Sequence, residues 1–258
     1  MIAIKSEKEI AVLREANQIV AEVLVALAGM VAPGISTGAL DEEAARLIRA
    51  YDAKASFLGY HGYPKSTCIS VDDQIIHGIP GKRKLQNGEI VSIDVGVKHR
   101  GYFGDAAVTV PCGTIDGPRQ RLMVTTDLAL SRAIAAAKEG NYLSDISRAV
   151  QATCEAEGFA VVRSFVGHGI GTAMHEEPQV PNFVTNEKGP RLRAGMVLAI
   201  EPMVNAGTHD VRVLRDGWTA VTADGKPSAH FEHSVVVREG GGEILSATPK
   251  LVWGRRTN

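Results

Sequence analysis

The chain has few cysteines and no export signal. Only three cysteines occur in 258 residues, they lie far apart, and none belongs to a CxxC pair (Cys68, Cys112 and Cys154). This pattern argues against a disulfide framework and a structural zinc finger, and it is typical of a reducing compartment. The opening residues, MIAIKSEKEI, lack the charged-then-apolar order of a secretory signal. We therefore predict a cytoplasmic protein.

Long apolar runs and an excess of one charge are also missing. The longest apolar stretch, IVAEVLVALAGMVAPG, contains Glu22 and is too short to span a bilayer. A net charge of -1 and an isoelectric point near 6.7 leave no dominant basic surface for nucleic acid. Neither a membrane nor nucleic acid is therefore an expected partner.

Several catalytic motifs are absent as well. The sequence has no GxSxG nucleophile elbow, which argues against a serine hydrolase, and it has no Walker loop. The stretch GHGIG lacks the strand–helix context and the downstream acid of a dinucleotide-binding fingerprint. The hydrophobic content of 45% and charged content of 22% are ordinary for a globular protein. The chemistry must therefore be sought elsewhere in the sequence.

The first half of the chain begins with two predicted helices. Ser6 and Glu9 form a capping-box pattern, and helical apolar spacing then continues to about Gly29. Thr37 is placed to cap a second helix at 39–53. A loop-rich segment and a strand pair follow.

The second half repeats this order. Pro118 suits the first turn of a helix that ends near Gly140, and Ser144 can cap another that closes at Gly158. Strands are then predicted at 159–165, 196–204, 210–222 and 228–238. Two helices followed by strands, twice over, predict a pseudo-duplicated α+β fold. No Pro/Ser-rich linker occurs, which favours a single domain over residues 1–258.

Residues 90–110, IVSIDVGVKHRGYFGDAAVTV, read as a β-hairpin with one aspartate in each strand. A turn centred on His99 and Arg100 would place Asp94 directly opposite Asp105, with Cβ atoms about 5 Å apart. Opposed like charges are destabilising unless a shared proton or a cation neutralises them. For this segment alone, a solvated polar face is the alternative explanation.

Further acids and histidines interrupt apolar segments. Glu201 lies within MVLAIEPMV and Glu232 begins the apolar run of AHFEHSVVV. His168 and His175 lie in the glycine-rich VGHGIGTAMHEEP, and His77 lies in IIHGIP. Carboxylates are rarely buried unless they are paired, hydrogen-bonded or bound to a metal. Any one of these residues, taken alone, could equally be a surface or structural residue.

Taken together, these residues favour a metal site. Imidazole with four carboxylates suits hard or borderline divalent ions and admits Mn, Fe(II), Co or Zn. Four carboxylates carry more charge than one divalent ion needs, so we predict two metals that share bridging carboxylates. A glycosidase would also use paired acids, but it would leave the histidines without a role.

Five segments in this order resemble type I methionine aminopeptidases: HGYPKSTCISVDDQIIHGIPG, IDVGV with GYFGDAAVTV, VGHGIGTAMHEEPQVPN, IEPM and HFEHSVVV. The resemblance covers roughly residues 3 to 247. It implies the pita-bread (creatinase/aminopeptidase) fold, in which antiparallel strands of two pseudo-symmetric halves line a dinuclear metal site. It also implies that Asp105 and Glu232 bridge the metals, that Asp94 binds one, and that His168 and Glu201 bind the other.

The same resemblance implies a reaction, the hydrolytic removal of the initiator methionine from nascent proteins whose second residue is small. A metal-bridging hydroxide would attack the scissile carbonyl. Glu201 would shuttle the proton, and His175 would stabilise the developing oxyanion. His77 would orient the substrate near the scissile nitrogen.

A methionine pocket is implied as well, formed by Tyr60, Tyr63, Cys68 and Trp218. An unbranched thioether packs well against aromatic rings and sulfur. Two residues depart from the common pattern of the family. Met174 stands where many relatives have phenylalanine, and Phe57 stands where cysteine is common. Both substitutions keep the pocket apolar.

Two alternatives are a proline-directed aminopeptidase of the same fold and a non-catalytic, protein-binding relative. The proline-directed enzymes usually carry a large additional N-terminal domain, whereas the fold's own helices account for residues 1–90 here. Non-catalytic relatives typically lose metal ligands, and all five are present here. The expected partners are nascent polypeptide N-termini, with transient ribosome association inferred from the substrate alone. Relatives suggest a monomer.

Overall fold

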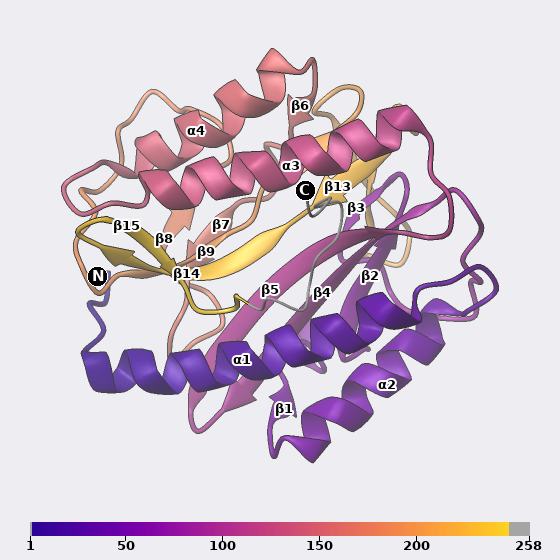
Figure 1. The fold of residues 1–258 in the computed structure, drawn as a ribbon, viewed down its shortest axis with the longest axis horizontal. Helices are drawn as coiled ribbons and strands as arrows, with labels where there is room; N and C mark the ends of the chain where they lie inside the picture. Colours follow the sequence, from indigo (N-terminus) through magenta and orange to yellow (C-terminus); the bar gives the residue numbers. More distant parts are fainter. Residues whose placement is uncertain (1, 248–258) are drawn as a thin grey trace, which may run out of the picture.

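The computed structural model describes residues 2–247, which form two helix pairs around a set of β-strands (Figure 1). The helices are α1 (Glu7–Met30), α2 (Thr37–Ala50), α3 (Gly117–Ala136) and α4 (Leu143–Ala156). In Figure 1 the α1–α2 pair lies below the strands and the α3–α4 pair lies above them. Each half of the chain thus begins with two helices, as predicted.

Side-chain caps define the starts of the first helix pair. The Ser6 hydroxyl accepts a hydrogen bond from the backbone N–H of Glu9 at 3.4 Å, and the Glu9 carboxylate accepts from the N–H of Ser6 at 2.8 Å. The predicted capping box is therefore present. The predicted cap of the second helix was wrong by one residue. Ser36 caps α2 by accepting from the N–H of Ala39 at 3.1 Å, and Thr37 is the first helical residue.

The second helix pair follows the prediction in part. Pro118 lies in the first turn of α3, behind the N-cap residue Asp116. Ser144 does not cap α4 as predicted, because it lies buried within the helix. The Asp145 carboxylate instead accepts a hydrogen bond from the N–H of Tyr142 at 2.8 Å and so satisfies a donor at the helix start.

The strands of the described residues form one large sheet and two small ones. Their bounds are β1 (Lys54–Ala55), β2 (Thr67–Val71), β3 (Gln74–Ile76), β4 (Ile90–His99), β5 (Tyr102–Pro111), β6 (Ala160–Val161), β7 (Gly167–Gly169), β8 (Glu176–Val180), β9 (Val197–Ile200), β10 (Met203–Asn205), β11 (Val211–Val213), β12 (Ala220–Thr222), β13 (Ser228–His230), β14 (Glu232–Arg238) and β15 (Gly241–Ile244). The large sheet has the order β1-β4-β5-β14-β9-β7-β8, with β2 paired to β4 and β15 paired to β14. The small sheets are β13-β10-β6 and β11-β12-β3.

Four predicted strands are shorter or more divided than expected. The segment 159–165 keeps only β6, and the other three segments each divide into two strands. Pro202 separates β9 from β10 because proline has no N–H to donate to a strand partner. A turn that contains Gly217, with a φ of 78°, separates β11 from β12.

The predicted hairpin forms, but its turn lies one residue later than predicted. His99 pairs with Tyr102, so the turn residues are Arg100 and Gly101. Their φ angles are 49° and 90°. A tight hairpin turn of type I′ requires this left-handed conformation at both positions, and glycine adopts it without strain.

This register changes how the two aspartates face each other. Asp94 pairs with Ala107, and Asp105 pairs with Gly96. The predicted direct opposition was therefore wrong. Because the turn lies one residue later, each residue pairs with a residue two positions further along the partner strand than predicted. A change of two positions keeps both carboxylates on the same face of the hairpin, as diagonal neighbours.

The two halves of the chain meet where β5 pairs with β14. This seam contains two residue pairs, Glu232 with Ala107 and His233 with Ala106. The Ser234 hydroxyl adds a hydrogen bond to the carbonyl oxygen of Asp105 at 2.8 Å. None of the helices in residues 2–247 is both long and apolar enough to cross a bilayer.

Candidate active site

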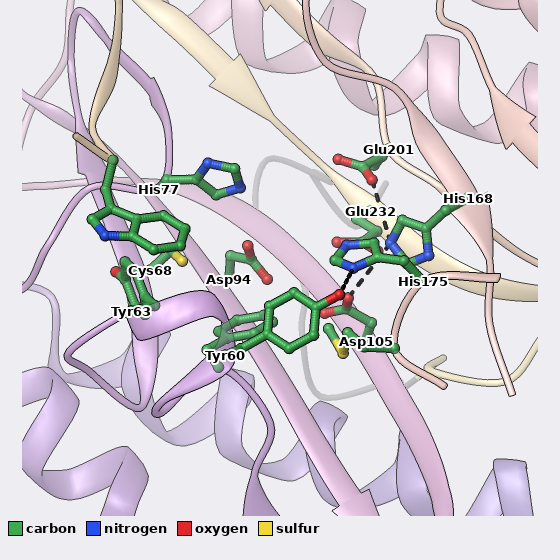
Figure 2. Close-up of a pocket in the computed structure, with 13 residues that line it drawn as sticks. Tyr60, Tyr63, Cys68, His77, Asp94, Asp105, His168, His175, Glu201 and Glu232 are labelled. Atoms are coloured by element: carbon green, nitrogen blue, oxygen red, sulfur yellow. Dashed lines mark hydrogen bonds and ion pairs between the residues drawn. The ribbon is translucent and has the colours of Figure 1, made fainter. Parts of the chain in front are cut away.

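One cavity gathers all of the residues that were predicted for the site (Figure 2). Its volume is about 140 Å³, roughly ten times the space that a single buried water needs. It is lined by Phe57, Tyr60, Tyr63, Cys68, His77, Asp94, Asp105, His168, Met174, His175, Glu201, Trp218 and Glu232. Residues from both halves of the chain therefore meet in one place.

Four of the five predicted metal ligands lie in strands of the large sheet, and the fifth directly follows one. Asp94 lies in β4, Asp105 in β5 and His168 in β7. Glu201 follows the last residue of β9, and Glu232 is the first residue of β14. Because these strands are neighbours in the sheet, they bring side chains from distant parts of the sequence together.

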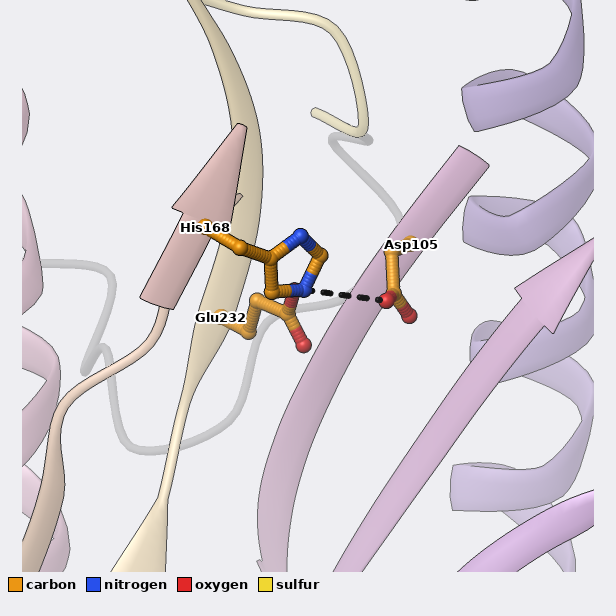
Figure 3. A group of neighbouring side chains, drawn as sticks. All are labelled: Asp105, His168 and Glu232. Carbon is orange, nitrogen blue, oxygen red and sulfur yellow. Dashed lines mark ion pairs between the residues drawn. The ribbon is translucent and has the colours of Figure 1, made fainter. Parts of the chain in front are cut away.

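Among the lining residues, Asp105, His168 and Glu232 form a compact group (Figure 3). One ligand atom from each lies within 4.8 Å of the others, and all three residues are buried. His168 Nε2 lies 4.0 Å from Asp105 Oδ2 and 3.7 Å from Glu201 Oε1. This spacing leaves room for a cation between the nitrogen and the oxygens.

The other ring nitrogen of His168 already has a hydrogen-bond partner. Its Nδ1 lies 2.9 Å from the carbonyl oxygen of Gly169. A carbonyl can only accept a hydrogen bond, so Nδ1 carries the hydrogen and Nε2 presents its lone pair to the cavity. A lone pair on a neutral imidazole is what a metal ion requires.

The carboxylates of the site are destabilised as anions. Burial raises the pKa of Asp94 to about 7 and that of Glu201 to about 8. The pKa values of Asp105 and Glu232 are raised well above their ordinary range, first by burial and then by the charges of the neighbouring carboxylates. Like charges held in a buried site repel each other unless protons or cations neutralise them.

Unpaired oxygens point to cations rather than to hydrogen-bond donors. Asp94 Oδ1, Asp105 Oδ1 and Glu232 Oε1 are buried and have no hydrogen-bond partner among the described residues. Buried polar groups without a partner are costly and uncommon. Divalent cations would satisfy all three oxygens, so this donor set fits a metal centre.

Two further histidines line the cavity. Burial, followed by the charges of His230 and His175, lowers the pKa of His77 to about 4, so its ring is neutral near pH 7. The His77 ring packs edge-on against Phe165 at 5.5 Å between centroids. His175 Nδ1 lies 2.6 Å from the hydroxyl of Tyr60.

The wall beside the carboxylates is apolar. The rings of Tyr63 and Trp218 meet edge to face, with their centroids 5.1 Å apart. The Tyr63 hydroxyl donates to the backbone of β2, toward the carbonyl of Thr67 at 3.0 Å. Cys68 in β2 pairs with Asp94 in β4, and burial raises the pKa of its thiol, which therefore stays neutral. An apolar recess thus adjoins the carboxylate group.

Sequence reasoning left one neighbouring residue unassigned. His230 is buried, and its Nε2 lies 3.6 Å from Glu201 Oε2. It stands two positions before Glu232 in AHFEHSVVV, so strand alternation would have placed both side chains on one face. That shared face was the available signal.

Comparisons with known proteins agree with this geometry. Residues 11–239 match the model of metallopeptidase family M24. Methionine aminopeptidase 1 of Bacillus subtilis is 48% identical over 95% of this chain and 99% of its own length. A crystal structure of methionine aminopeptidase from Thermotoga maritima has a TM-score of 0.94 at 42% identity, over 96% of this chain and all of that one.

A more distant structure gives the fold alone. The prolidase of Pyrococcus horikoshii has a TM-score of 0.74 at 21% identity, and it matches 95% of this chain but 63% of its own. The predicted pita-bread fold is confirmed by these matches.

Proposed function

Because the chain belongs to metallopeptidase family M24, we propose that it uses divalent metal to remove the N-terminal methionine from nascent proteins. The observation that carries this proposal is the meeting of four buried carboxylates and His168 beside an apolar recess. The carboxylates suit hydrolytic metal chemistry, and the recess suits an uncharged side chain. The relatives named methionine aminopeptidase align over nearly the whole chain, which favours this function over proline-directed cleavage.

The proposed ligands of two metal ions are Asp94, Asp105, His168, Glu201 and Glu232. Divalent ions held there would act as Lewis acids and would make water a competent nucleophile near neutral pH. Asp105 and Glu232 lie in the two strands that pair at the seam between the halves, so both halves would supply ligands. The donor set admits Mn, Fe(II), Co or Zn.

Three side chains would act on the substrate itself. Glu201 accepts a proton from the attacking water and returns it to the leaving nitrogen. His175 donates a hydrogen bond to the carbonyl oxygen as negative charge develops on it. His77, neutral and partly buried, orients the peptide near the scissile nitrogen.

The apolar recess would select methionine. The thioether side chain would lie against the aromatic rings of Tyr63 and Trp218 and near the thiol of Cys68. Phe57 and Met174 complete the apolar lining, and Tyr60 borders it. The carboxylates beside the recess would hold the free amino terminus, which limits cleavage to the first residue. A small second residue would be preferred because the larger ones meet the walls of the cavity.

The proposed cellular location of the protein follows from its substrate. Nascent chains are made in the cytoplasm, so we place the protein there, as a monomer that associates transiently with the ribosome. The chain is also proposed to fold as one domain, because strands of both halves share the large sheet.

Peptide cleavage by the metal-stripped protein tests the function. Mn, Fe(II), Co and Zn would each be restored in turn, with Met-Ala-Ser, Met-Leu-Ser and Ala-Pro-Ser as substrates. We expect metal-dependent release of methionine from Met-Ala-Ser alone. Cleavage of Ala-Pro-Ser would indicate a proline-directed peptidase, and no cleavage with any metal would refute the catalytic function.

A further inference from the structure

A hydrogen bond between Tyr60 and His175 crosses the cavity from one half of the chain to the other. The Tyr60 hydroxyl lies 2.6 Å from His175 Nδ1, and the two rings are 5.3 Å apart (Figure 2). Tyr60 comes from a short 3-10 turn of the first half, Tyr60–Gly62. His175 comes from the segment between β7 and β8 of the second half. Contact at this distance fixes the position of the imidazole relative to the hydroxyl.

Both partners of this hydrogen bond are held by their own surroundings. The backbone of Tyr60 donates to the carbonyl of Phe57 at 2.9 Å, and the ring of His61 meets the Tyr60 ring edge-on at 4.4 Å. Next to His175, the Glu176 carboxylate accepts from the backbone N–H of Thr172 at 2.8 Å. The same carboxylate forms an ion pair with Lys5 at 2.6 Å. The segments that carry the pair are thus both anchored.

His168 shows how such a partner decides which ring nitrogen carries the hydrogen. Its Nδ1 faces a carbonyl oxygen, so that its Nε2 has a free lone pair suited to a metal ion. The partner of His175 differs, because a hydroxyl can donate. Burial raises the pKa of Tyr60, so the phenol keeps its hydrogen. The cavity that His175 faces is lined by four carboxylates, and an N–H is favoured there over a second lone pair.

We propose that the Tyr60 hydroxyl donates to His175 Nδ1 and thereby holds the imidazole in the tautomer with its hydrogen on Nε2. The two neighbouring histidines, whose rings are 4.2 Å apart, then have opposite roles. His168 offers a lone pair to a cation, and His175 offers a hydrogen-bond donor to the substrate. This inference rests on the proposed function, since an Nε2 donor is useful where negative charge develops on a carbonyl oxygen. Tyr60 is a positioning residue that acts through His175.

Nuclear magnetic resonance can read the tautomer without turnover. The full chain would be labelled with ¹⁵N-histidine and loaded with Zn, which is diamagnetic, and two-bond ¹H–¹⁵N correlations would be recorded near neutral pH. The signals of His175 would be assigned from a His175→Gln variant. We expect the hydrogen on Nε2 in the unmodified protein and a mixture of tautomers in Tyr60→Phe. A hydrogen on Nδ1 in the unmodified protein would overturn the proposal.

Kinetics provide the second measurement. Loss of one neutral hydrogen bond changes an equilibrium by roughly two- to tenfold, so Tyr60→Phe should lower kcat on Met-Ala-Ser by that factor. Its KM should stay within about twofold, because the ring that borders the pocket is retained. Tyr51→Phe, at a solvent-exposed tyrosine that does not line the cavity, should change neither constant. An unchanged kcat or an unchanged tautomer in Tyr60→Phe would refute the inference.

Failure of this inference can be told apart from failure of the proposed function. If the unmodified, metal-loaded protein does not cleave Met-Ala-Ser, the function fails, while the tautomer measurement still decides the direction of the hydrogen bond. If it cleaves the peptide and His175 carries its hydrogen on Nδ1, the inference alone fails.

Discussion

Removing the divalent cations should make the stability of the protein fall as pH rises from about 7 to about 8. Burial raises the folded-state pKa of Asp94 to about 7 and that of Glu201 to about 8, far above the ordinary values of 3.8 and 4.5. Between the ordinary and the raised values, the folded protein retains protons that the unfolded chain has released. Stability therefore declines with rising pH across that interval.

The size of this loss of stability depends on the number of protons that the folded protein retains. Each one gives a slope of about 1.4 kcal/mol per pH unit. Across this pH interval one proton would cost about 1.4 kcal/mol, which lowers Tm by roughly 3–6 °C for a chain of this size. Buried histidines oppose this trend only at lower pH. Burial lowers the pKa of His77, His168 and His233 to about 4, and it also lowers the pKa of His175 and His230. These histidines are neutral in the folded state, and in the unfolded chain they lose most of their protons once pH rises above about 7.

Thermal unfolding followed by circular dichroism would measure the effect in chelator-treated and Mn-loaded protein. The Mn-loaded protein should not show the decline, because bound cations keep the carboxylates ionised in the folded state. Glu232→Gln in the metal-free form should show a shallower decline, because it removes one of the carboxylates whose charges repel each other. A Tm of the metal-free protein that is constant or rises over this pH range would refute the reasoning.

Three substitutions test other parts of the site. Asp94→Ala should abolish turnover and lower the bound metal measured by atomic emission, and full activity would contradict the dinuclear mechanism. His175→Ala should retain metal and lose roughly 100- to 1,000-fold in kcat; loss of metal would instead make it a ligand. Gly167→Ala should lower the free energy of unfolding in urea by about 1–3 kcal/mol, because its Cβ would overlap the carbonyl oxygen of Ala199. Gly29→Ala, in open space, should not destabilise.

The sequence predicted which side chains lie together in the site more accurately than it predicted how they are arranged. The carboxylates and histidines that interrupt apolar segments identified the polar residues of the site, and the family resemblance added the residues of the apolar lining. The hairpin register was missed because the turn was centred on the polar residues, whereas the left-handed backbone at Arg100 and Gly101 decides it. The missed cap at Ser36 has a similar cause, since Ser36 and Thr37 are both capping types and the backbone conformation decides which of them caps the helix.

Partnerships between side chains could not be predicted from the sequence in the same way. The Tyr60–His175 hydrogen bond joins two loops that are distant in the chain, and neither loop has a periodic pattern. The contact between His230 and Glu201 joins the last residue of β13 to the residue after β9, and these two strands belong to different sheets. Such contacts arise from the packing of the two halves, and local propensity does not determine that packing.

The narrow seam between β5 and β14 has a consequence for how the protein unfolds locally. Asp105 and Glu232 stand on either side of it, so a cation that binds both acts as a cross-link between the halves. Neither half can then unfold locally without breaking a bond that the other half shares. Amide hydrogens of both halves should accordingly exchange with solvent in one cooperative event. An internally repeated architecture would thus behave as a single unit for as long as its ions are bound.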